Sequence, residues 1–289
     1  MFVAHPQRGH VPRRRTFGSV ALALTLALVA SIFLAPGVAH AARPAGSALV
    51  GPKIYYLALG DSLAFGYQPN WDFSHSYPAQ WYSSNLSKHH VSHYTNYGCN
   101  GETSATFVNG GCPYAFLLHN SYSGSQLNAA LSFLKAHPGA VSPVSLDIGA
   151  NDLLPDINSS TCAVSSTWAT DLANLDTRLT GTILPKLTAA LTSNGARTGD
   201  LVMMNYYDPY QNSCPTSLAY VQTLNQHLAA DAAQFNVPVA DVFTALGGAT
   251  TPNPNICTDT WMCASSPNIH ATTAGYGVIA NTFGSTTGY

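Results

Sequence analysis

Residues 54–63 read IYYLALGDSL, an apolar run that ends in a glycine and two polar residues. A continuous apolar run of this length, bounded by turn residues, predicts a strand that is buried on both faces. Three later stretches have the same character, at Val144–Ile148, Leu201–Tyr207 and Val237–Phe243. Strands buried on both faces are typical of parallel sheets, so the chain is expected to form an α/β fold.

Helical periodicity fills the sequence between these strands. Apolar residues recur at steps of three and four over residues 168–191 and again over 218–235, and both patterns predict amphipathic helices with one buried stripe. A last helix is expected over Thr272–Phe283. Strands that alternate with helices imply helices on both faces of the sheet, and such sheets bind ligands beyond the carboxyl ends of their strands.

The N-terminus has the pattern of an export signal. Residues 1–17 carry four arginines, an apolar run follows over Val20–Leu34, and small residues end it at Ala39-His40-Ala41. We therefore predict a signal peptide over 1–41, a flexible leader over 42–52 and one domain over 53–289, secreted from the cell. A retained membrane anchor is the alternative, but a spanning helix needs about 20 apolar residues. The twin arginine in the basic head also leaves the export route open.

Charge and cysteine content exclude some functions. Without the four signal arginines the chain has seven Lys and Arg residues against thirteen Asp and Glu, a net charge of −6 that argues against nucleic acid as a partner. Six cysteines in an exported chain predict disulfides rather than a zinc site, because no CxxC pair is present. Pairing in sequence order closes two short loops at little entropic cost. The expected pairs are Cys99–Cys112, Cys162–Cys214 and Cys257–Cys263.

Two polar segments directly follow predicted strands. Gly60-Asp61-Ser62-Leu63 places a serine hydroxyl on a tight turn, where the serine amide can also face a developing oxyanion. The alternative is that Ser62 only caps the next helix. Gly149-Ala150-Asn151-Asp152 offers an asparagine amide as a second kind of oxyanion donor, although Asn and Asp also favour turns and caps.

Two further segments lie away from those strand ends. Residues 96–104 contain Glu102, the only glutamate of the chain, which either acts as a general acid or orders its glycine-rich loop. Pro267-Asn268-Ile269-His270 places a histidine just before the last predicted helix, from which it can reach back over the sheet edge.

In this order, the motifs GDSL, GET and GAND, followed by the late histidine and Gly-Tyr, resemble the SGNH, or GDSL, hydrolase family. The resemblance covers nearly all of the chain after the predicted signal. It implies a three-layer α/β/α sandwich on a five-stranded parallel sheet, which is the flavodoxin-like SGNH fold. It also implies a serine esterase or lipase that needs no metal or organic cofactor.

The resemblance assigns roles to individual residues. Ser62 corresponds to the nucleophile and gives the first oxyanion donor through its backbone amide. Gly101 corresponds to the second backbone donor, with Gly98 as the alternative, and Asn151 gives the third through its side chain. His270 corresponds to the general base, which later protonates the leaving alcohol.

The chain departs from the family at the partner of the histidine. The family usually has an aspartate three residues before the histidine, sometimes two, and here those positions hold Pro267 and Asn268. A backbone carbonyl within residues 266–268 is the expected replacement, because it needs no unusual loop. The Asn268 side-chain oxygen and a remote acid such as Asp259 are the alternatives. A catalytically impaired binding homologue is the hypothesis from another class.

The substrate is expected to be a lipid or short-acyl ester, hydrolysed by a monomer without a stable membrane anchor. The second hypothesis is a carbohydrate O-deacetylase. An acyl pocket should be closed and aliphatic, whereas a glycan site should be open and aromatic. Aromatic residues near the predicted strand ends suit either site, or simply the core: Tyr206, Tyr207, Tyr210, Trp261 and Phe65.

Overall fold

The computed structural model describes residues 49–289. The predicted signal peptide and most of the predicted leader lie outside the described residues, so the boundaries at 41 and 52 stay predictions. Among the described residues, no helix has the length and apolar character needed to cross a membrane.

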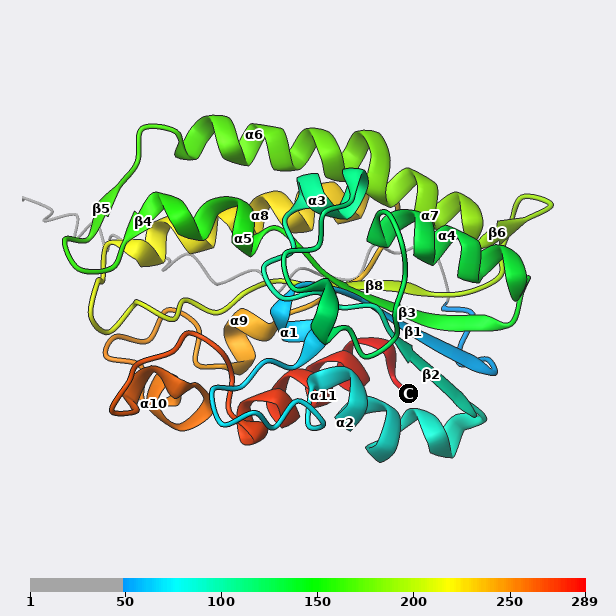
Figure 1. The fold of residues 1–289 in the computed structure, drawn as a ribbon, viewed down its shortest axis with the longest axis horizontal. Helices are drawn as coiled ribbons and strands as arrows, with labels where there is room; N and C mark the ends of the chain where they lie inside the picture. Colours follow the sequence, from blue (N-terminus) through cyan, green and yellow to red (C-terminus); the bar gives the residue numbers. More distant parts are fainter. Residues whose placement is uncertain (1–48) are drawn as a thin grey trace, which may run out of the picture. The chain divides into compact units, whose positions relative to one another are not determined.

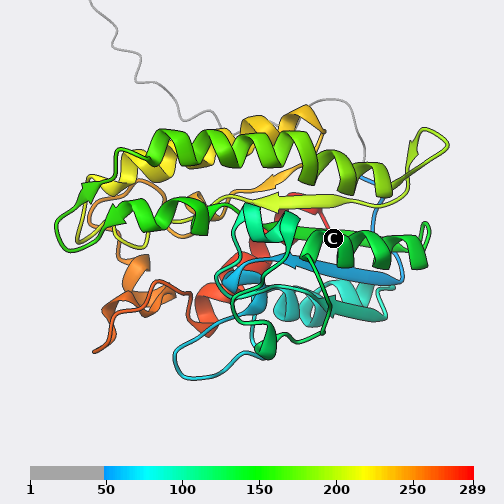
Figure 2. The ribbon, with the colours of Figure 1, turned by 45° about the horizontal axis from the view of Figure 1, so that its top comes forward.

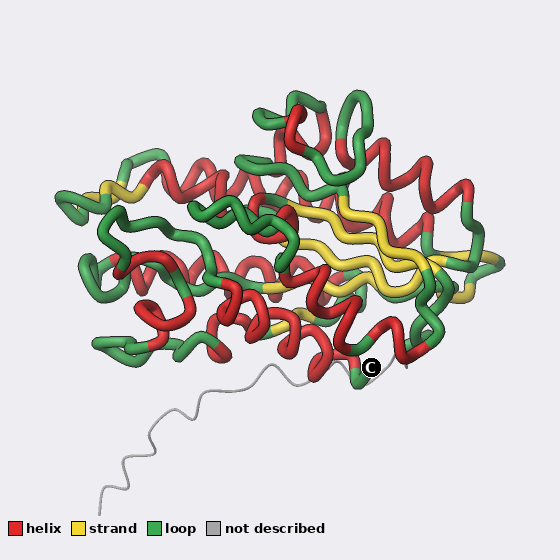
Figure 3. Tube along the Cα trace, turned by 60° about the horizontal axis from the view of Figure 1, so that its bottom comes forward, coloured by secondary structure: helices red, strands yellow, loops and turns green. Residues whose placement is uncertain are grey.

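A five-stranded parallel sheet forms the centre of the domain, in the order β2-β1-β3-β8-β9. The strands are β1 (Tyr55–Gly60), β2 (His93–Asn96), β3 (Val141–Asp147), β8 (Leu201–Met204) and β9 (Val239–Ala240). The central strands β3 and β8 are buried along their whole length, as expected for apolar strands covered on both faces. Figure 3 shows the strands running side by side with helices on either side.

Helices cover both faces of this sheet, which confirms the predicted three-layer sandwich (Figures 1 and 2). One face carries α3 (Ser104–Asn109), α4 (Gln126–Ala136), α5 (Ala150–Leu153), α6 (Trp168–Arg178), α7 (Leu184–Ala190) and α8 (Ser217–Gln234). The other carries α1 (Ser62–Phe65), α2 (Tyr77–Ser84), α9 (Val242–Ala245), α10 (Asn255–Asp259) and α11 (Thr273–Thr287).

Short elements complete the fold. A π-helical turn over Leu179–Ile183 joins α6 to α7, so the stripe predicted as one helix is one nearly continuous helical rod with a wide turn inside it. Two small antiparallel hairpins pair β4 (Ile157–Asn158) with β5 (Ala163–Val164) and β6 (Thr192–Ser193) with β7 (Ala196–Arg197). The 3₁₀ turns are Leu86–His89, Ala115–Leu117, Leu154–Asp156 and Trp261–Cys263.

The strand register sets the position of the polar segments. Gly60 at the end of β1 pairs with Asp147 at the end of β3, and Leu146 pairs with Met203 on β8. Because the three strands are parallel, the chain leaves all of them at the same edge of the sheet. The segments that begin at Asp61 and Gly149 are therefore neighbours, as the sequence predicted.

Three disulfides join the six cysteines in the expected sequence order. Cys99–Cys112 closes the loop between β2 and the 3₁₀ turn Ala115–Leu117. Cys162–Cys214 ties the segment that enters α6 to the segment that enters α8. The third, Cys257–Cys263, joins α10 to the turn that precedes the His270 loop. Each disulfide thus constrains a segment near the carboxyl edge of the sheet.

Candidate active site

Ser62 is the first residue of α1, immediately after the turn that ends β1. Asp61 caps this helix, because its Oδ1 accepts the Leu63 N–H at 2.8 Å. The Ser62 hydroxyl is therefore not used as the cap, which excludes the capping alternative for this residue. Gly60 has φ +141° and a side chain there would collide with the Asp147 backbone, so only glycine fits this turn.

His270 faces Ser62 from the loop before α11. Its Nε2 lies 2.8 Å from Ser62 Oγ, and its Nδ1 lies 2.6 Å from Asn268 Oδ1. The Asn268 oxygen also accepts the backbone N–H of His270 at 3.1 Å, which identifies this atom as the amide oxygen. The imidazole therefore carries its proton on Nδ1 and presents the Nε2 lone pair to the serine hydroxyl.

The expectation of a backbone carbonyl as the histidine partner was wrong. Asn268 bonds the N–H two residues later in the manner of an Asx turn, and the same oxygen meets the ring. Asp259, the remote acid that was considered, is instead engaged through its backbone, whose carbonyl accepts the Thr272 N–H at 2.9 Å. The third member of the arrangement is thus a neutral amide from the residue two positions before the histidine.

The His270 loop is held by contacts on several sides. Tyr207 Oη donates to the carbonyl of Ile269 at 2.6 Å, and Trp261 N–H donates to the carbonyl of His270 at 2.9 Å. The ring of Tyr67 lies 4.7 Å from the His270 ring, centroid to centroid. Burial without a carboxylate against the ring lowers the pKa of His270 to about 4, so the imidazole is neutral over most of the pH range.

Asn151 lies at the N-terminal end of α5 and is joined to the glycine-rich loop. Its Nδ2 donates to the carbonyl of Glu102 at 3.0 Å, which leaves the second hydrogen of this amide for a ligand. Gly101, the expected backbone donor, precedes Glu102 and has φ +75°. Gly101 is not among the described residues that line the cavity at Ser62. The alternative, Gly98, already donates its N–H to Asn96 Oδ1 at 2.8 Å.

Glu102 is buried behind this loop rather than exposed to the cavity. Its Oε2 accepts from Gln126 Nε2 at 3.1 Å and from Tyr122 Oη at 3.4 Å, while burial raises the pKa of its carboxyl. Gln126 also bonds both backbone groups of Gly60, at 2.6 Å to the N–H and 2.9 Å to the carbonyl. These contacts favour the loop-ordering interpretation of Glu102. Gln126 could not be found from the sequence, because no motif surrounds it.

A pair of buried acids lies beneath the serine turn. Asp147 Oδ2 accepts the N–H groups of Asp61 and Ala64, and its Oδ1 accepts Tyr77 Oη at 2.6 Å. Asp61 Oδ2 accepts Tyr206 Oη at 2.9 Å. Burial raises the pKa of both carboxyls, that of Asp147 most strongly because it also lies against Asp61. In the sequence, Asp147 stands out only as a charged residue inside an otherwise mostly apolar run.

Cys99, Cys112 and Glu102 bring metal-binding atom types close together. The two sulfurs are bonded to each other, however, so neither is a thiolate, and one carboxylate remains. This donor set does not fit a metal ion.

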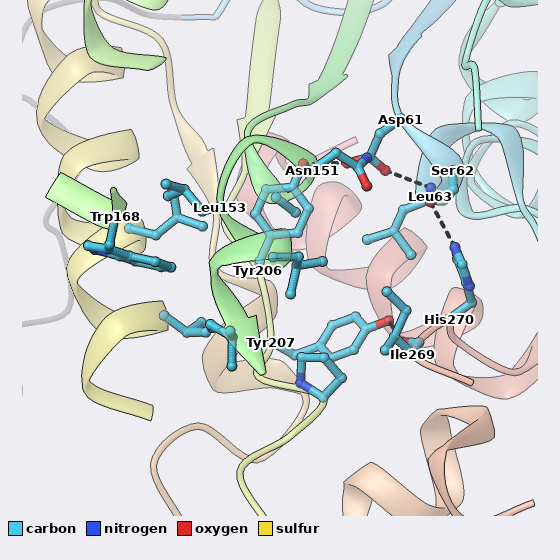
Figure 4. A pocket seen from close by; sticks show the side chains of 16 residues that line it. Asp61, Ser62, Leu63, Asn151, Leu153, Trp168, Tyr206, Tyr207, Ile269 and His270 are labelled. Atoms are coloured by element: carbon cyan, nitrogen blue, oxygen red, sulfur yellow. Dashed lines mark hydrogen bonds between the residues drawn. The ribbon is translucent and has the colours of Figure 1, made fainter. Parts of the chain in front are cut away.

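A cavity opens beside Ser62 and His270. Its lining is mostly aliphatic, with Tyr206, Tyr207 and Trp168 as the aromatic members. Figure 4 shows Ser62 and His270 at one end and Trp168 at the other, with Leu153 and the two tyrosines between them. Of the other aromatic candidates, Phe65 is buried against Phe73 and His119, and neither Tyr210 nor Trp261 is among the described residues that line the cavity.

Of three similar solved structures, the first supports this fold. One similar structure is a single-substitution variant of an acetyl-xylooligosaccharide esterase from Geobacillus Stearmophilus, with TM-score 0.54, 15% identity, and coverage of 83% of this chain and 96% of that one. Another is phospholipase A1 from Streptomyces albidoflavus, with TM-score 0.49, 18% identity, and coverage of 81% and 99%. An extracellular lipase from Streptomyces rimosus gives TM-score 0.48, 17% identity, and coverage of 81% and 99%.

Sequence comparison identifies the family. No curated protein matches the chain. The model of the GDSL-like Lipase/Acylhydrolase family matches residues 58–278, which include the serine turn, the glycine-rich loop, the GAND segment and the His270 loop. With this match over most of the sequence, the chain belongs to the GDSL-like Lipase/Acylhydrolase family of hydrolases.

Proposed function

We propose that this chain is a secreted serine esterase that hydrolyses carboxylic esters through an acyl-enzyme on Ser62. One observation carries the proposal: Ser62 Oγ, the His270 imidazole and the Asn268 side chain form a continuous hydrogen-bonded series at 2.8 and 2.6 Å. Nucleophile, base and orienting group at these distances are the arrangement that activates a serine hydroxyl.

In the first half-reaction, His270 Nε2 takes the proton of Ser62 as the hydroxyl oxygen attacks the ester carbonyl. The oxyanion that forms accepts hydrogen bonds from the Ser62 N–H and the Asn151 amide, both of which line the cavity. The protonated imidazole then donates to the leaving alcohol. Asn268 holds the ring orientation and tautomer throughout, without adding a negative charge.

In the second half-reaction, water replaces the alcohol. His270 removes a proton from this water as its oxygen attacks the acyl-enzyme carbonyl, and the imidazolium returns the proton to Ser62 as the acid leaves. Apart from the substrate and water, every group named in these two half-reactions belongs to the described residues. Three disulfides support export, because such bonds persist in oxidising compartments.

Deacetylation of carbohydrate is the second candidate function. The observation that favours it is Trp71, which is 75% exposed on the loop that also carries Phe73 and Tyr67. A series of ring contacts, of which only Phe73–Tyr67 is stacked, leads from Trp71 through Phe73 and Tyr67 to His270. Exposed aromatic rings of this kind can stack on sugars. The enclosed aliphatic lining at Ser62 favours an acyl group instead.

A fluorophosphonate probe tests the proposal directly, because it phosphonylates only an activated serine. We expect intact protein to label with one equivalent of probe, Ser62→Ala to remain unlabelled, and the matched control Ser74→Ala to label as the parent does. Hydrolysis of p-nitrophenyl acetate should follow the labelling. A folded parent protein that neither labels nor hydrolyses would instead support a non-catalytic binding homologue.

Side-by-side assays separate the two substrate classes. Acetylated xylan and p-nitrophenyl esters of increasing acyl length are supplied to the same enzyme preparation. Esters with longer chains should be hydrolysed at least as well as the acetate if the cavity holds the acyl group. Preference for acetylated xylan, with loss of that activity in Trp71→Ala, would favour the deacetylase.

A further inference from the structure

The end of the cavity farthest from Ser62 is lined by buried residues that lie outside all four family-like motifs. Trp168, the first residue of α6, lies there and is only 7% exposed. In Figure 4 its side chain lies on the far side of the pocket-lining residues from Ser62 and His270. Val221 and Leu224 of α8 and Ile157 of the small hairpin line the same cavity.

The Trp168 ring is fixed in place by its neighbours. Tyr220 of α8 packs edge-on against it at 5.1 Å between ring centroids, with an interplanar angle of 74°. The backbone N–H of Trp168 donates to the Ser165 carbonyl at 3.3 Å, where the chain enters α6. A ring that is packed from behind and anchored at its backbone cannot swing aside without disturbing both helices.

A disulfide fixes the two walls relative to each other. Cys162 precedes α6 by a short segment and Cys214 precedes α8, and the bond between them joins the N-terminal ends of both helices. Ser217 Oγ reinforces the α8 end by donating to Asp208 Oδ2 at 2.6 Å. The position of this far end is therefore set by a covalent link as well as by packing.

We propose that Trp168 is a specificity-determining residue, whose ring stops the acyl chain of the substrate and so limits the enzyme to esters of short to medium linear acids. This inference rests on the proposed function, because it assumes that the acyl group on Ser62 extends into this cavity. Each methylene buried in the cavity favours binding about fourfold until the chain meets the ring. Further methylenes have no space, so longer chains bind less well.

The aromatic residues that line the cavity carry three polar groups: the indole N–H of Trp168 and the hydroxyls of Tyr206 and Tyr207. The hydrogen bonds of the described residues give the Trp168 indole N–H no acceptor, whereas Trp261 Nε1 donates to Gln68 and Trp81 Nε1 to Tyr289. Tyr207, which also lines the cavity, uses its hydroxyl on the Ile269 carbonyl, and Tyr206 uses its hydroxyl on Asp61. Both tyrosine hydroxyls are therefore engaged by protein acceptors, which suits a lining for an acyl chain.

The test is the acyl-length dependence of kcat/KM for p-nitrophenyl acetate, butanoate, octanoate and dodecanoate. In the parent protein we expect kcat/KM to rise with length and then to fall at the longest ester. Trp168→Ala should raise the ratio of dodecanoate to butanoate kcat/KM by about tenfold or more, because removal of the ring lengthens the cavity. The conservative variant Trp168→Phe should shift the ratio much less.

Val221→Phe changes the cavity in the opposite direction. A larger side chain on this wall should lower the octanoate-to-acetate ratio by about tenfold. Phe235→Ala is the matched control for Trp168→Ala, because it also replaces a large side chain with a small one. Phe235 follows the end of α8 and does not line the cavity, so this variant should keep the acyl-length profile of the parent. The pair Val221→Phe and parent also decides the question if Trp168→Ala does not fold.

The outcomes separate this inference from the proposed function. Labelling of Ser62 and hydrolysis of acetate, together with length profiles that neither Trp168→Ala nor Val221→Phe alters, would overturn the inference and leave the esterase proposal standing. A parent profile that is flat from acetate to dodecanoate would do the same. Absence of labelling and of all hydrolysis would remove both proposals together.

Discussion

The serine side and the histidine side of the candidate site are supported in different ways. Ser62 is the first residue of α1, just after the central strand β1, and lies above the buried carboxyls of Asp61 and Asp147. His270 stands on a loop, and the group against its ring is the neutral amide of Asn268. The negative charge that usually lies behind the base is thus absent, while buried acids lie beneath the nucleophile.

This difference separates two tasks that one aspartate commonly performs, orientation of the imidazole and stabilisation of its cation. Asn268 performs the first through two hydrogen bonds from His270. Among the described residues no carboxylate lies against the ring to perform the second, and burial lowers the pKa of His270. The buried acids fix the shape of the serine turn without touching the imidazole.

The largest expected effect comes from removal of the base. His270→Ala should lower kcat for p-nitrophenyl butanoate by on the order of 10⁶-fold, as loss of a single member of a serine–histidine unit does elsewhere. Burst kinetics and fluorophosphonate labelling provide the measurement. A variant that retains more than a hundredth of the parent kcat would show that the histidine side is not the catalytic half of this comparison.

Asn151→Ala tests the segment that joins the two sides. Loss of one oxyanion donor typically lowers kcat by about 10²–10³-fold with little change in KM. Asn151→Asp, which keeps the size but removes the donor, should lose as much. The result would be contradicted by a change confined to KM, since that pattern indicates only ground-state binding.

Asn268→Asp makes the histidine side resemble the more common arrangement. In the parent protein the neutral imidazole is the active form, so kcat/KM should hold as pH falls and drop only near pH 4. A carboxylate beside the ring stabilises the imidazolium and raises the pKa of His270. The acid limb of the pH profile should therefore move to higher pH by one unit or more.

Asn268→Ala is the companion variant for orientation. It removes both hydrogen bonds to His270, so kcat should fall by up to about 100-fold, while the acid limb stays low because no charge is added. Equal pH profiles for Asn268→Asp and the parent would contradict the contact between the side chain at position 268 and the His270 ring.

The smallest effect concerns stability and a buried acid outside both sides. Burial and the neighbouring Asp176 raise the pKa of Asp231 to about 7, so folding favours its protonated form. That contribution to stability is lost as pH rises through about 7. The melting temperature should therefore increase by a few degrees from pH 8 to pH 6.5, and less so in Asp231→Asn.

The pH window matters for this measurement. His270 is neutral in the folded protein, whereas in the unfolded chain it is already half protonated at pH 6.5, so its burial offsets part of the gain from Asp231. Asp231→Asn keeps the His270 contribution, so the difference between this variant and the parent isolates Asp231. An equal change in melting temperature from pH 8 to pH 6.5 in the parent and in Asp231→Asn would contradict the raised pKa of Asp231.

Much of the fold was predictable, because the central strands are continuous apolar runs. β1 and β3 lie within three residues of their predicted limits. β2 was not predicted, since this edge strand reads HYTN and three of its four residues are at least partly exposed. β9 is shorter than the apolar run over Val237–Phe243, because Asp241 begins the helix that follows.

The candidate site was predictable where a motif marks it and not elsewhere. Ser62, Asn151 and His270 lie on segments that the sequence order singles out, and the structure brings all three to one cavity. Trp168 and Gln126 act through contacts with elements far along the chain, so their local sequence carries no sign of them. The choice of Asn268 over a carbonyl depended on a side-chain turn that spacing alone does not decide.

The burial of Glu102 has a practical consequence. It is the only glutamate of the sequence and is 1% exposed, so a glutamate-specific protease has no accessible peptide bond to cut in the folded domain. Cleavage requires that the glycine-rich loop first open, and the rate of nicking then reports how often it does. The two fragments would stay joined through Cys99–Cys112 and separate only on a reducing gel, which gives this one loop its own readout of local unfolding.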